Sequence, residues 1–142
     1  GTKVEKDGFL GTYDSQVTVL PEGNNYDFFG WAVPIQPNKF SLSRTLWSWL
    51  MPSKAYRLNT NMNGEQRAFV VTGEYEKVLP MTIYPVQLLK SCLVEDIDAM
   101  EGLGIYEVVP EDLALCEFAC TSKQPVQEIL QNGLDLVKKE CA

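Results

Sequence analysis

Hydrophobic and polar positions alternate over residues 16–20, and this alternation, with the aromatic segment that follows, predicts β-structure in the first third of the chain. Residues 16–32 combine an alternating arm, a cluster of turn formers and an aromatic, β-prone arm, which together predict a hairpin. A second hairpin is predicted for residues 57–72, whose two arms flank Asn63-Gly64. Asn-Gly favours tight hairpin turns because it tolerates the positive φ angles that these turns require.

A short helix is predicted between the hairpins, over residues 40–51. Most apolar residues of its second half share one helical face, whereas Trp49 projects elsewhere. Ser41 or Ser43 would cap its beginning, and Pro52 would end it.

Apolar residues recur at helical spacing in the second half of the chain. Pro85 opens the first predicted helix there, since a proline costs nothing in the first turn. Asp96 can cap a second, short helix that runs through Met100. Gly102 or Gly104 would end that helix.

Two further helices are predicted after residue 109. One begins at Pro110 with Glu111 and Asp112 in its first turn, where the helix dipole favours acidic residues. The last contains Gly133, which costs about 1 kcal/mol relative to alanine. Its apolar stripe consists of Val126, Ile129, Leu130, Leu134 and Val137. The pattern therefore predicts an α+β fold, with N-terminal β-hairpins followed by a small C-terminal helical bundle.

Length and composition are those of one ordinary globular domain. The chain has 142 residues, of which 45% are hydrophobic and 22% charged, and it lacks an apolar run long enough to span a membrane. It begins with Gly1-Thr2-Lys3 instead of methionine, which suggests tag residues on a piece of a longer protein. Four cysteines are too few for a disulfide scaffold, so reduced thiols and a cytoplasmic location are expected.

Charge is unevenly distributed along the chain, whose formal net charge is −7. Residues 39–57 contain four basic residues and no acidic one, whereas residues 95–117 contain eight acidic residues and no basic one. An acidic majority argues against nucleic-acid binding, which requires a basic footprint.

Cys116 and Cys120 lie four residues apart in a chain without histidine. In a helix they would share one face, and apolar neighbours would cover most of the remaining surface, so the helix is expected to be buried and the cysteines to act as small core residues. The alternative is a zinc or iron–sulfur site formed with Cys92 and Cys141. Metal sites usually pair cysteines two residues apart, and no histidine can complete this set.

Two surface segments are candidates for partner binding. Arg44, Trp47 and Trp49 lie in the basic, aromatic segment, and tryptophans flanked by cations suit a membrane or protein interface. The alternative is a helix that its tryptophans hold against the hairpins. The segment 94–102 is rich in acidic residues but lacks the spacing of a calcium loop. It is therefore expected to be a solvated face or a surface for a basic partner.

No catalytic residue is predicted. The chain lacks histidine, a Gly-x-Ser-x-Gly elbow, a phosphate-binding loop and a dinucleotide fingerprint. No pair of carboxylates stands out as a general acid and base.

Several segments together resemble the carboxy-terminal part of the A-subunit of the bacterial Na⁺-translocating NADH:quinone oxidoreductase. The resemblance covers nearly the whole chain, in order. The segments are Phe9-Leu-Gly-Thr-Tyr13, Gln16-Val-Thr-Val-Leu20, Phe29-Gly-Trp-Ala32, Asn38-Lys-Phe-Ser41, Asn63-Gly64, Gly73-Glu-Tyr-Glu-Lys-Val-Leu-Pro80 and Glu111-Asp-Leu-Ala-Leu-Cys116.

The resemblance implies that the chain is roughly the last third of a longer subunit. Residues 1–37 would finish a β-grasp-like unit, and residues 38–142 would form an α+β C-terminal domain with a helical second half. The parent complex transfers electrons from NADH to quinone and exports Na⁺. Its A-subunit is a peripheral cytoplasmic protein on the inner membrane, next to membrane subunits, and is linked to quinone binding. Flavins and iron–sulfur centres belong to other subunits, so this domain is expected to carry no cofactor.

The resemblance also bears on the cysteine pair. In the A-subunit family the corresponding stretch usually reads Cys-x-x-x-Cys-Pro-Gly-Lys, and related subunits of other complexes bind clusters there. Here Cys120 is followed by Thr121-Ser122-Lys123, without the proline and glycine. Cys116 and Cys120 are therefore expected to be a vestigial pair. The alternatives are a cysteine-ligated metal or iron–sulfur protein and an unrelated protein-binding module.

Overall fold

The computed structural model describes residues 4, 6–12, 15–24, 27–30, 36, 38–41, 44, 46–70 and 73–141, except for the side chain of Cys141. The chain divides into two units, Thr2–Glu65 and Gln66–Ala142. Residues 26, 31 and 32 of the aromatic arm of the first predicted hairpin, the candidate cap Ser43 and the end of the second hairpin lie outside the described residues. The boundary predicted at residue 37 stays a prediction.

No β-strand occurs among the residues that the structure describes, so the predicted α+β class and its hairpins are wrong. Val17 and Val19 would lie on one face of a strand, yet both are exposed, Val19 by 88%. Without a core to cover that face, a two-stranded hairpin is only marginally stable.

Hydrogen bonds connect the segments of the two predicted hairpins to each other, and connect the second segment to the helical unit. The amide of Thr60 donates to the carbonyl of Pro21 at 3.2 Å, and the amide of Gly23 donates to Thr60 Oγ1 at 3.0 Å, so the predicted turn of the first hairpin contacts the first arm of the second. Beyond the Asn-Gly turn, the amide of Arg67 donates to the carbonyl of Ser122 at 2.8 Å. The second arm therefore joins the other unit.

The helix predicted over residues 40–51 is wrong in type and length: the structure has one 3₁₀ turn there, η1 (Trp47–Leu50). Arg44 has a φ of 60°, a left-handed conformation that a right-handed helix cannot contain. Ser41 does not cap the turn with its hydroxyl; instead its amide donates to Ser48 Oγ at 3.1 Å.

The helical second half is confirmed. It contains η2 (Tyr75–Lys77), α1 (Pro85–Val94), α2 (Ile97–Gly102), η3 (Ile105–Glu107), η4 (Pro110–Leu113), α3 (Ala114–Ala119) and α4 (Val126–Cys141). Prolines begin α1 and η4, as expected. Asp96 caps α2 by accepting a hydrogen bond from the amide of Ala99 at 3.0 Å. The acidic first turn predicted at Pro110 is present, and Asp112 Oδ2 accepts from the amide of Val109 at 3.1 Å.

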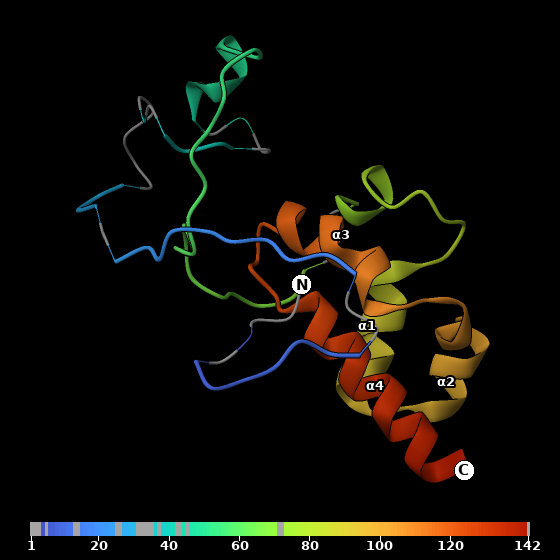
Figure 1. Ribbon diagram of the computed structural model, residues 1–142. Coiled ribbons are helices and arrows are strands. Elements are labelled where there is room, and N and C mark those ends of the chain that lie inside the picture. The colour runs from blue at the N-terminus through green and yellow to red at the C-terminus, as the bar shows by residue number, and fades with distance from the viewer. Residues whose placement is uncertain are drawn as a thin grey trace. The chain divides into compact units, whose positions relative to one another are not determined.

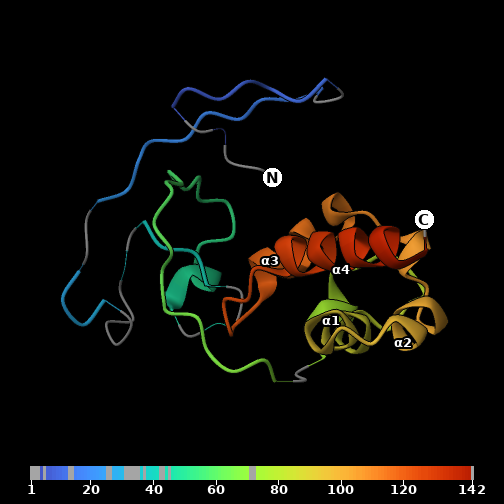
Figure 2. The ribbon, with the colours of Figure 1, turned by 90° about the horizontal axis from the view of Figure 1, so that it is seen from below.

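The four α-helices pack around one hydrophobic core within the unit Gln66–Ala142 (Figure 1). Helix α4 packs across α1, and α3 lies beside the N-terminal end of α4 (Figure 2). The predicted stripe of α4 is correct, because Val126, Leu130 and Val137 are buried in this core. Gly133 lies directly against Cys92 of α1, which explains a glycine in the middle of a helix.

Candidate functional site

The predicted docking residues lie around η1. Trp47 and Trp49 are 49% and 52% exposed, and Arg44 is exposed as well. The tryptophans therefore do not hold a helix against hairpins, which was the alternative expectation.

Ser48 anchors this turn. Its Oγ accepts from the amide of Ser41, and its carbonyl accepts from the amide of Met51 at 3.1 Å and from the Tyr56 hydroxyl at 3.4 Å. In a 3₁₀ turn, residues three apart lie one above the other, so Trp47 and Leu50 share one side. Trp49 occupies another side, and the partly buried Ser48 faces the third.

The charge around η1 is entirely basic over a long stretch of sequence. No aspartate or glutamate occurs between Asp27 and Glu65. Lys39 forms an ion pair with Asp27 at 2.9 Å, and the ammonium of Lys54 lies 5.8 Å from the centroid of the Tyr56 ring. Along the sequence, the nearest acidic residues to this segment are therefore Asp27 and Glu65, at its two ends.

The cysteine pair lies in the core of the other unit. Cys116 belongs to α3, whereas Cys120 follows the end of that helix with extended backbone angles. Both are buried, as predicted. Cys120 Sγ accepts a hydrogen bond from the Tyr75 hydroxyl at 2.9 Å and one from the amide of Gln124 at 3.4 Å.

Burial, with smaller contributions from the negative charge of Glu76 and from the nearby Cys120, raises the pKa of the Cys116 thiol to about 11. Burial likewise raises the pKa of Tyr75, and its hydrogen bond to Cys120 adds to this effect. Cys116 is therefore a neutral thiol at pH 7. Since the thiolate is both the nucleophile and the metal ligand, this environment opposes both roles.

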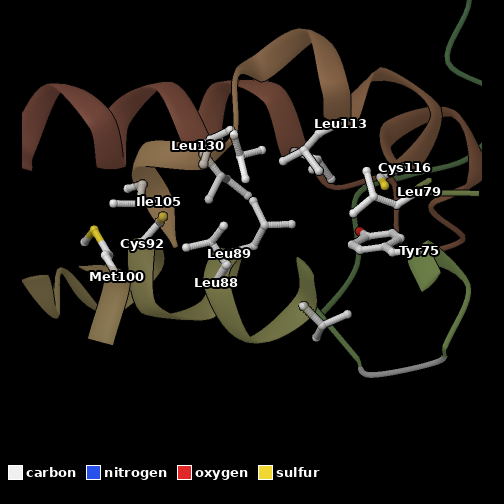
Figure 3. Packing of buried hydrophobic residues seen from close by; sticks show 14 of the residues in the cluster. Tyr75, Leu79, Leu88, Leu89, Cys92, Met100, Ile105, Leu113, Cys116 and Leu130 are labelled. Atoms are coloured by element: carbon white, nitrogen blue, oxygen red, sulfur yellow. The ribbon is translucent and has the colours of Figure 1, made fainter. Parts of the chain in front are cut away.

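Among the described side chains, Cys92 does not join Cys116 and Cys120 in a cluster. Cys92 lies beside Met100 and Ile105 at one end of the core, and Cys116 lies beside Tyr75 and Leu79 at the other (Figure 3). The side chain of Cys141 is outside the described residues. Within the described part of the chain, no three cysteine or acidic side chains come together as a metal-binding group.

Sequence reasoning missed the contacts that hold Cys120. Tyr75 is 45 residues away in sequence, so no local signal predicts the hydrogen bond between them. The prediction that this helix is buried nearly all round is wrong, because Leu115 and Phe118 are 57% and 54% exposed.

The acidic stretch is mostly exposed, and several of its residues make local hydrogen bonds. Besides the helix-capping Asp96 and Asp112, Glu117 Oε2 accepts from the amide of Gln127 near the start of α4 at 2.9 Å. Glu101 Oε1 accepts from the Tyr106 hydroxyl at 2.6 Å. These contacts stabilise helix ends and turns.

Comparison with known proteins places this geometry in context. No protein-family model matches the chain. Over 132 residues, or 93% of the chain, it is 40% identical to the A-subunit of the Na(+)-translocating NADH-quinone reductase of Neisseria meningitidis serogroup B. It is 43% identical, over the same share, to the A-subunits of Vibrio anguillarum and Haemophilus influenzae. The chain is homologous to the A-subunits of the Na(+)-translocating NADH-quinone reductases.

The homology confirms the resemblance drawn from the sequence motifs. The chain spans 29% of the length of these A-subunit relatives. None of the helices that the structure describes is long and apolar enough to cross a bilayer.

Proposed function

We propose that the chain is a C-terminal portion of an A-subunit and acts there as an assembly domain of a Na⁺-translocating NADH-quinone reductase. The complex as a whole would transfer electrons from NADH to quinone and export Na⁺, with this part holding the peripheral, cytoplasmic subunit on its membrane-bound partners. The observation that carries the proposal is the identity of about 40% over 93% of the chain.

Two features of the structure support an assembly role over a redox role. Cys116 is a buried, neutral thiol, and Cys120 already accepts two hydrogen bonds. Arg44, Trp47 and Trp49 instead offer cationic and aromatic surface in one short segment, which is the composition of binding surfaces.

A truncation in the full-length protein tests the assembly role. We expect that an A-subunit lacking the residues of this chain no longer co-purifies with the other subunits, whereas the intact protein with the same tag does. Immunoblotting of the purified complex and NADH-driven quinone reduction would be measured. A truncated complex that assembles and turns over normally would refute the proposal.

A separate measurement tests the absence of a cofactor, which is part of the proposal. The chain purified without oxygen should be colourless and free of metal, with its helical content intact. A visible absorption band with stoichiometric iron or zinc would instead favour the cysteine-ligated alternative, formed with residues including Cys92 or Cys141.

A further inference from the structure

We infer that the turn η1 and its flanking cations bind the surface of an anionic lipid bilayer. The inference deepens the proposed function, on which it rests for the identity of the membrane. The binding surface consists of Arg44, Trp47, Trp49, Leu50, Met51 and Arg57, and is called the η1 surface below.

Apolar exposure is the first observation behind this inference. Trp47, Trp49, Leu50 and Met51 are all about half exposed, and they lie in one 3₁₀ turn and the residue that follows it. Within Trp47–Leu50 the partly buried residue is Ser48, whose hydrogen bonds to Ser41, Met51 and Tyr56 hold the turn. The polar residue therefore faces the protein and the apolar residues face outward, which reverses the usual arrangement of a surface turn.

The distribution of these side chains favours lipid over a protein groove. A groove receives one face of a helix, with anchors three, four and seven residues apart. Here Trp47 and Leu50 lie on one side of the 3₁₀ turn and Trp49 lies on another. A fluid interface can surround both sides, and tryptophan is enriched at the headgroup level of bilayers.

Charge indicates which lipid is bound. Arg44 and Arg57 flank η1, and Lys54 lies between them in a region without any acidic residue from 28 to 64. Basic residues next to a membrane gain from the negative potential of anionic headgroups. The remainder of the chain is acidic, since the net charge is −7, so an anionic bilayer would repel it and select this segment for contact.

Vesicle binding of the full 142-residue chain tests the inference. We expect binding to vesicles of phosphatidylglycerol and phosphatidylcholine, with a blue shift of tryptophan fluorescence, and much weaker binding to phosphatidylcholine alone. The double variant Trp47→Ala/Trp49→Ala should lower the partition coefficient about tenfold or more. Each of Arg44→Gln and Arg57→Gln should lower it about fivefold, and salt should weaken binding of the wild type.

Matched variants separate this surface from nonspecific effects. Leu93→Ala/Val94→Ala removes exposed apolar surface from α1, and Lys138→Gln/Lys139→Gln removes two exposed cations from α4. Both should bind vesicles as the wild type does. Trp47→Tyr/Trp49→Tyr should retain most of the binding, because tyrosine also favours the interface. Far-UV circular dichroism would show that the variants keep the helical unit.

Two results would overturn the inference. One is equal binding of the wild type to neutral and anionic vesicles, and the other is unchanged binding of the Trp47→Ala/Trp49→Ala variant. If that variant bound vesicles normally but no longer co-purified with the other subunits, the η1 surface would be a protein contact. The assembly proposal would then stand while the lipid inference failed.

Discussion

Replacing Gly133 by alanine tests how closely α4 packs against α1. A Cβ at this position would lie 2.6 Å from Cys92 Sγ, 3.1 Å from Cys92 Cβ and 3.3 Å from Ile105 Cδ1. Side chains in such a core fill space at crystal-like density, so the Cys92 side chain or the helix that carries it must shift. Overpacking of this kind costs about 1–3 kcal/mol, and higher helix propensity returns about 1 kcal/mol. We expect Gly133→Ala to lower the free energy of unfolding by up to about 2 kcal/mol, the difference between these two effects.

Urea unfolding followed by far-UV circular dichroism measures this change in the helical unit. Gly102→Ala is the matched control, because Gly102 also lies in a helix and has nothing within 4 Å of an added Cβ. It should be neutral or slightly stabilising. The double variant Gly133→Ala/Cys92→Ala removes the closest atom, so its loss should be smaller than the sum of the single losses. The packing argument is wrong if Gly133→Ala is as stable as Gly102→Ala.

Three further predictions concern hydrogen bonds and protonation in the same unit. Because the folded pKa of Cys116 is raised to about 11 from an ordinary 9.0, its contribution to stability is complete below pH 9.0 and is lost as the pH rises toward about 11. Urea midpoints across that range should fall, and should fall less in Cys116→Ala. Tyr75→Phe removes the donor to Cys120 Sγ and should cost about 1 kcal/mol by the same assay. Asp96→Ala should cost about 1 kcal/mol through loss of the α2 cap, whereas Asp98→Ala, in the same first turn, should cost less.

The helical half was predictable because its signals are local. Pro85, Pro110 and Asp96 act within one turn of their own positions, so the sequence near each residue contains the whole cause of the helix start. The α4 stripe was equally visible, since its period alone identifies the buried face. The close packing around Gly133 could not be predicted from the sequence, because Cys92 contacts it from another helix.

The predicted hairpins failed because alternation specifies a strand only when a core covers one face. Val19 alternates correctly and is nevertheless exposed. Asn63-Gly64 also forms a turn, but the chain beyond it joins the α3–α4 connection through Arg67 and Ser122. Partner choice depends on contacts distant in sequence, and the pattern of one segment does not contain them.

Residues 121–122, directly after Cys120, form hydrogen bonds with the segment that precedes α1. Thr121 donates to Glu74 Oε2 through its amide and its hydroxyl, and the carbonyl of Ser122 accepts from Arg67. These contacts, together with the Tyr75 hydroxyl on Cys120 Sγ, attach Arg67, Glu74 and Tyr75 to the connection between α3 and α4. The Tyr75 hydroxyl and the amide of Gln124 both donate to Cys120 Sγ, and each such hydrogen bond contributes about 1 kcal/mol. Cys120 therefore has a structural role that needs no ligand, because its sulfur holds Tyr75 against the connection between α3 and α4.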